Sequence, residues 1–111
     1  MKNPNFVSES IQALRDTLEL SREYLSAGHS NLVQRNFEEA ERLLTVAVQC
    51  VNRGLEIQEN LSKHTKHHQC ELIRILLGFI RTEAVSDLSI LEVCKTVHDR
   101  GSLPPLTSVL H

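Results

Sequence analysis

Apolar and polar positions alternate along this chain with the period of an α-helix, most clearly between residues 36 and 60. Spacings of three and four place one set of apolar positions on a single helical face. Asn36 precedes the run in the position of an N-cap, and Glu39 follows three residues later, as in a capping box. The pattern predicts a helix from Phe37 to about Leu61. Its apolar face consists of Phe37, Ala40, Leu44, Ala47 and Val51.

An earlier apolar stripe predicts a first helix, which Ser8 or Ser10 can cap. Gly28 interrupts this stripe, and a Gly inside a helix costs roughly 1 kcal/mol relative to Ala. The pattern resumes with a Leu-Val pair, so we expect the helix to continue through Gly28. The turn at residues 35–36 is short and predicts an antiparallel hairpin. The stripe consists of Val7, Ile11, Leu14, Leu18 and Leu25.

The second half of the chain predicts two further helices. Residues 62–69 are polar and basic and predict a loop or an exposed junction. The helix expected over residues 69–83 is apolar around most of its circumference, which is typical of the centre of a bundle or of an oligomer interface. We expect a break at residues 84–87, and then a fourth helix that ends at Gly101.

These elements predict an all-α protein: an antiparallel bundle of about four helices, built on a long hairpin, over residues 1–101. Residues 102–111 form a tail rich in Pro and Leu, in which Pro104 and Pro105 exclude a helix. One small bundle has difficulty covering a helix that is apolar nearly all round, so we expect a homodimer. The tail and the third helix are the expected partner surfaces. On that helix the expected contacts are Leu72, Leu76 and Phe79.

Composition agrees with helix packing, because 41% of residues are hydrophobic while the 4 Gly and 3 Pro are too few for a turn-rich sheet protein. The net charge of −2 makes the whole chain a poor attractor of nucleic acid. The 3 cysteines are an odd number without CxxC spacing and indicate a reducing compartment. With no signal peptide and no membrane span in the sequence, we expect a cytoplasmic protein.

Within residues 21–54, the first helix carries a large residue, a small residue and then a Gly. The next helix carries two Ala with a bulky apolar residue between them. This pattern resembles one unit of the tetratricopeptide repeat, although no Pro closes the unit and no second unit follows. It also resembles the three-helix microtubule-interacting-and-trafficking domain. The matching residues are Tyr24, Ala27 and Gly28, and Ala40, Leu44 and Ala47. The resemblance implies a groove that binds a peptide or helix, with exposed contacts at Tyr24, Asn31 and Gln34.

A cluster of histidines follows the second helix. On a helix, His64, His68 and Glu71 would share one face, and two imidazoles with a carboxylate could hold Zn²⁺ or Ni²⁺. The spacing is not HExxH, and no base lies within the pair. We therefore favour a solvated polar face, and we expect neither a metal nor another cofactor.

Basic residues in the same region support a different hypothesis. Small helical dimers can lay a cationic face across double-stranded RNA and recognise backbone shape without base contacts. Some viral suppressors of RNA silencing do so. The acidic start of the second helix and the net charge of −2 argue against this alternative. Its candidate residues are Lys63, Lys66, Arg74 and Arg81, which Arg42 and Arg53 could extend.

Catalytic motifs find little support in the sequence. It has no phosphate-binding Gly-rich loop, no GxSxG and no pair of carboxylates that reads as buried. Cys94 and His98 stand four residues apart, but no third group is placed to orient a thiolate–imidazole pair. We expect a non-catalytic protein–protein interaction module, an adaptor or regulator, and not an enzyme.

Overall fold

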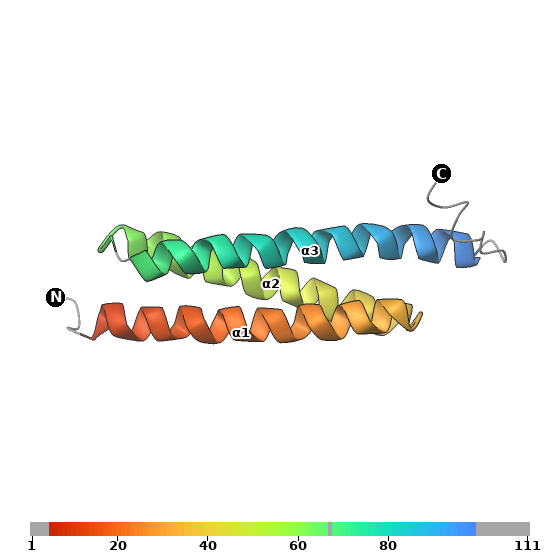
Figure 1. Ribbon diagram of the computed structural model, residues 1–111, viewed down its shortest axis with the longest axis horizontal. Helices are drawn as coiled ribbons and strands as arrows, with labels where there is room; N and C mark the ends of the chain where they lie inside the picture. The colour runs from red at the N-terminus through yellow and green to blue at the C-terminus, as the bar shows by residue number, and fades with distance from the viewer. Residues whose placement is uncertain (1–4, 67, 100–111) are drawn as a thin grey trace.

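The computed structural model describes residues 5–66 and 68–99, and within these ranges the chain forms three α-helices and no strand (Figure 1). They are α1 (Phe6–Val33), α2 (Phe37–Ser62) and α3 (His68–Asp99). The all-α prediction is confirmed, but the predicted number of four helices is wrong. Gly101 and the predicted tail at 102–111 lie outside the described residues.

The three helices run up, down and up again. α1 and α2 form the predicted antiparallel hairpin, and α3 returns parallel to α1, with α2 behind both in Figure 1. The resulting rod measures 61 × 24 × 16 Å along its principal axes. None of the helices among the described residues combines the length and the apolar character needed to cross a bilayer.

The corner between α1 and α2 is a Schellman motif. The Asn36 N–H donates to the Asn31 carbonyl at 2.8 Å, and the Arg35 N–H donates to the Leu32 carbonyl at 3.0 Å. Arg35 takes the left-handed conformation, with φ of 66°, at the position where glycine is commonest. These bonds satisfy the last carbonyls of α1 and reverse the chain within three residues.

The predicted helix starts are correct in place for α2 and wrong for α1. Asn36 is the N-cap of α2, but its side chain makes no capping bond and donates instead to Asn31 Oδ1 at 3.3 Å. Glu39 is paired with Arg42 and does not complete a capping box. α1 begins at Phe6, so Ser8 and Ser10 lie inside the helix and cap nothing.

The core lies along the line where the three helices meet. Leu14, Val51 and Leu77 are fully buried at its centre, and Leu44 and Leu91 are buried nearer to the α1–α2 corner. α1 is continuous through Gly28, as predicted. A Cβ at Gly28 would lie 2.7 Å from Leu44 Cγ, so the absence of a side chain lets α2 approach closely.

α3 is one helix of 32 residues, and the predicted break at residues 84–87 is wrong. Ala84 is fully buried and Asp87 is 8% exposed, because both continue the face that packs on α1 and α2. Ser and Asp favour a helix terminus when their side chains compete for backbone groups. Here the Asp87 carboxylate accepts a hydrogen bond from His29 of α1 instead, so the helix continues.

Candidate interaction site

α3 carries two rows of residues, each with alternating spacings of three and four. This period of 3.5 residues is the pattern of a coiled-coil seam. The inner row is buried against α1 and α2, and the outer row is exposed along its whole length. The inner row comprises Cys70, Ile73, Leu77, Ile80, Ala84, Asp87 and Leu91. The outer row comprises Leu72, Leu76, Phe79, Glu83, Ser86, Ile90 and Val93.

Five of the seven positions in the outer row are large and apolar. Phe79 is 65% exposed, Leu72 is 55% exposed and Val93 is 53% exposed. Ile75, beside the row, is also exposed. The partner contacts that the sequence predicts on α3 all belong to the first two turns of this row. The sequence alone could not distinguish these exposed contacts from the equally apolar residues of the buried inner row.

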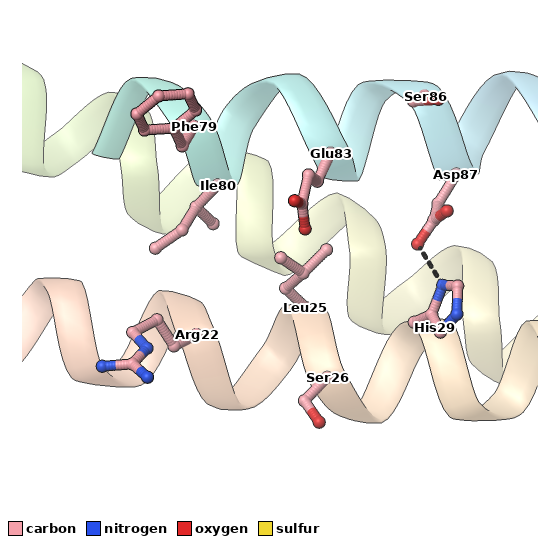
Figure 2. Close-up of a pocket in the computed structure, with 9 residues that line it drawn as sticks. All are labelled: Arg22, Leu25, Ser26, His29, Phe79, Ile80, Glu83, Ser86 and Asp87. Atoms are coloured by element: carbon pink, nitrogen blue, oxygen red, sulfur yellow. Dashed lines mark hydrogen bonds and ion pairs between the residues drawn. The ribbon is translucent and has the colours of Figure 1, made fainter. Parts of the chain in front are cut away.

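A groove runs between α1 and α3 beside the outer row (Figure 2). Its main cavity has a volume of about 540 Å³, and a smaller cavity of about 310 Å³ adjoins it near Leu76. Phe79 and Ile80 contribute to both cavities, as does Arg22. The main cavity is lined from α1 by Arg22, Leu25, Ser26 and His29, and from α3 by Phe79, Ile80, Glu83, Ser86 and Asp87.

A polar contact links the two helices at one end of the groove. His29 Nδ1 lies 2.9 Å from Asp87 Oδ2, and the Asp87 side chain is only 12% exposed (Figure 2). Sequence reasoning missed this pair, because its members are 58 residues apart and neither belongs to a motif. Sequence reasoning also missed the contribution of Arg22 to the groove.

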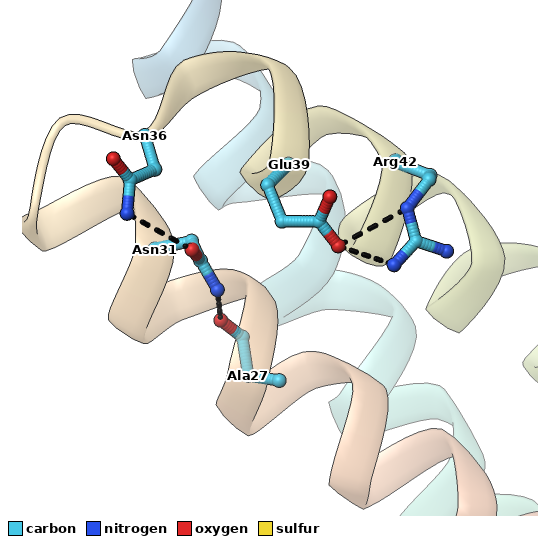
Figure 3. A network of polar contacts seen from close by, with 5 residues as sticks. All are labelled: Ala27, Asn31, Asn36, Glu39 and Arg42. Atoms are coloured by element: carbon cyan, nitrogen blue, oxygen red, sulfur yellow. Dashed lines mark hydrogen bonds and ion pairs between the residues drawn. The ribbon is translucent and has the colours of Figure 1, made fainter.

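The contacts predicted from the family resemblance lie elsewhere, on the α1–α2 side. Asn31 is half-buried, donates to the Ala27 carbonyl at 2.8 Å and accepts from Asn36 (Figure 3). Tyr24 is half-buried and Gln34 is exposed. Tyr24 and Asn31 are seven residues apart and share a face of α1, which is not the face that lines the groove. The predicted contacts therefore belong to two separate surfaces.

The six basic residues of the RNA alternative are all exposed, but two of them have acidic partners. Arg42 pairs with Glu39 and Arg74 pairs with Glu71, in both cases within one helix. In each pair the guanidinium hydrogen bond lowers the pKa of the carboxyl. These pairs offset part of the positive charge. The other four residues are Arg53, Lys63, Lys66 and Arg81.

Two of the three candidate metal ligands, His64 and Glu71, make other contacts. The His64 ring packs edge-on against Phe6, with ring centroids 5.5 Å apart, and Glu71 faces Arg74. Within the described part of the chain, no group of three or more His, Cys, Asp or Glu is placed to hold a metal ion.

The cysteines show no sign of an activated nucleophile. Burial raises the pKa of the Cys50 and Cys70 thiols, which favours the unreactive protonated form. His98, four residues after Cys94, packs its ring against Phe37, with centroids 5.8 Å apart. The arrangement of these residues is that of helix packing.

No family model matches the sequence, and no curated protein or solved structure is significantly similar to it. Neither these comparisons nor the three-helix fold identifies a tetratricopeptide repeat or a microtubule-interacting-and-trafficking domain. The α1–α2 hairpin runs from residue 6 to residue 62, whereas a tetratricopeptide unit has about 34 residues. Ala40, Leu44 and Ala47 are fully buried, as in any closely packed helical hairpin.

Proposed function

We propose that this protein is a non-catalytic interaction module that acts by helix packing and forms a homodimer through the outer row of α3. The observation that supports the proposal is the exposure of that row, in which Leu72, Phe79 and Val93 each leave more than half of their surface in water. Contiguous exposed apolar surface on a small protein marks an interaction site. The coiled-coil period of the row suits a partner that is itself a helix.

The energetic argument rests on the same side chains. Burying one large apolar side chain completely contributes about 1.5–3 kcal/mol, so covering a half-exposed one contributes roughly half of that. Five such residues in one row therefore offer several kcal/mol to a helix that packs along them. The bundle itself cannot use this surface, because its three helices already meet on the inner row.

A separate surface supports the adaptor part of the proposal. Tyr24, Asn31 and Gln34 lie on the α1–α2 side of the rod, so pairing through the outer row of α3 leaves them accessible to another protein. The described cysteines are free thiols, which is consistent with the reducing cytoplasm as the place of action.

Light scattering coupled to size-exclusion chromatography tests the dimer. We expect the native chain to elute as a dimer at high micromolar concentration and Phe79→Lys to elute as a monomer. The substitution places an ammonium in the outer row, and Glu83 one turn later supports the helix. Val33→Lys is the matched control, since Val33 is 69% exposed and lies off the row, at the end of α1.

A native chain that stays monomeric at high micromolar concentration would contradict the proposal. Both variants should keep the helical circular dichroism of the native chain, because neither residue is buried. A gel shift with generic duplex RNA at two salt concentrations tests the alternative. Binding that is strong at low salt and lost at high salt would favour an RNA-binding protein. No shift at low salt would remove that alternative.

A further inference from the structure

We propose that the two copies pair antiparallel through α3, about a two-fold axis that passes between Ala84 and Val85. This inference rests on the proposed function, since it assigns the second copy as the occupant of the outer row and fixes its orientation. The identity of the occupant and its orientation both follow from the order of side chains along the outer row.

Antiparallel pairing about this axis brings apolar residues from opposite ends of the row together. The seam of a coiled coil alternates between a and d positions. In an antiparallel pair, each a position of one helix faces a d position of the other helix. The first half of the outer row holds three large residues, and apolar residues recur in the second half and one turn beyond it. The resulting layers are Leu72 with the partner's Val97, which is half-buried in its own bundle, Leu76 with the partner's Val93, and Phe79 with the partner's Ile90.

The two polar positions of the row decide the orientation. In the antiparallel arrangement Glu83 faces the partner's Ser86, whose hydroxyl can donate a hydrogen bond to the carboxylate. Two-fold symmetry forms this contact twice, at the centre of the interface. In a parallel, in-register pair, Glu83 would face the partner's Glu83, and two carboxylates would repel each other where they lose solvent. Arg22 lines the same groove from α1 but lies opposite Phe79 and Ile80 in Figure 2, and its ion-pair partner is Glu19, at 4.0 Å.

The size of the surface agrees with a specific but modest dimer. The outer row spans 22 residues from Leu72 to Val93, or about 32 Å of helix. With the adjoining rim of α1 the contact would be about 20 Å wide, which gives roughly 600 Å² per copy and on the order of 1,200 Å² in total. This area is at the lower limit of standard interfaces, and we expect a dissociation constant on the order of micromolar.

Disulfide trapping tests the orientation in the full-length chain. Cys50, Cys70 and Cys94 are first replaced by Ala, and the dimer is verified by light scattering. Leu76→Cys and Val93→Cys are then made separately in this background. Oxidation of a mixture of the two variants should give covalent dimers, because the two positions face each other across the antiparallel interface. Either variant alone should give few, because its two introduced thiols lie far apart.

Efficient cross-linking of either variant by itself would indicate a parallel pair. In a protein that scatters as a dimer, that result would overturn the orientation and leave the proposed function intact. A native chain that scatters as a monomer would remove both.

A second measurement keeps the native cysteines. Ser86→Lys would place an ammonium against the partner's Glu83 in the antiparallel dimer, and we expect a dissociation constant several-fold lower than that of the native chain. In a parallel dimer the two new ammonium groups would face each other and weaken association. Ser89→Lys is the matched control, since Ser89 is exposed on α3 but lies off the outer row. Weaker association of Ser86→Lys than of this control would contradict the proposal.

Discussion

At the scale of single residues, Gly28 sets how closely α1 approaches α2. A Cβ there would lie 2.7 Å from Leu44 Cγ and 3.2 Å from the Leu44 backbone nitrogen. Leu44 is fully buried and has little space to move into. Ala is the better helix former by about 1 kcal/mol, but we expect this clash to outweigh the gain. Gly28→Ala should therefore lower the free energy of unfolding by about 1–3 kcal/mol in urea titrations.

The other helical glycines provide a graded control for this prediction. A Cβ at Gly78 would meet nothing within 4 Å, so Gly78→Ala should stabilise the protein by up to about 1 kcal/mol. A Cβ at Gly54 would lie 2.9 Å from Leu77 Cδ1, the end of a flexible side chain, and 3.0 Å from Thr17 Cγ2, and neither atom belongs to the backbone. Gly54→Ala should rank between the other two. The close packing at Gly28 would be contradicted by equal stabilisation of all three variants.

The buried thiols give stability a dependence on pH. Burial raises the pKa of Cys70 and Cys50 in the folded state above the unfolded value of about 8.5. Their contribution to stability is therefore complete below the unfolded pKa and is lost as the pH rises through the folded pKa. We expect a lower urea midpoint at pH 9.5 than at pH 7. Replacing both cysteines by Ala should shrink the difference between the two midpoints, and an unchanged difference would assign it to other groups.

At the scale of elements, the continuity of α3 is testable by proline. Val85 is 44% exposed, so replacing it removes little packing. Pro at this position would remove a backbone hydrogen bond and clash with the carbonyl one turn earlier, at a cost of about 3 kcal/mol or more. Val85→Ala keeps the N–H and should change the free energy of unfolding only slightly. If Val85→Pro were as stable as Val85→Ala, that result would favour a break in the helix at residues 84–87, as the sequence predicts, over a continuous α3.

Periodicity was sufficient to predict that α1 and α2 exist and form a corner at residues 35–36, because the core-facing residues resume their repeat after Gly28, but it did not locate the start of α1. It failed at residues 84–87, where Ser86 and Asp87 resemble a helix start and the reason for continuity lies in His29, far away in the sequence. The same limit applies to the candidate site. Leu76 and Leu77 are equally apolar in the sequence, and only the packing of α1 and α2 buries the second and exposes the first.

At the scale of the whole molecule, the rod shape limits how much core the three helices can build by themselves. The radius of gyration is 17.7 Å, whereas a compact chain of 100 residues has about 13 Å. A rod of three helices has a thin core and a large surface for its volume, so its own packing supplies limited stability. In the proposed dimer, a second copy along the outer row would thicken the core without any change in the fold.

The proposed dimer predicts that stability depends on protein concentration. Only folded chains can form the dimer. The urea midpoint of the native protein should therefore rise with protein concentration once that concentration exceeds the dissociation constant. Each tenfold increase should then add about 1.4 kcal/mol per mole of dimer. Phe79→Lys should show one midpoint at all concentrations, while Val33→Lys should follow the native protein. A native midpoint that stays constant over a hundredfold range around the micromolar dissociation constant would mean that the outer row is exposed for a reason other than self-association.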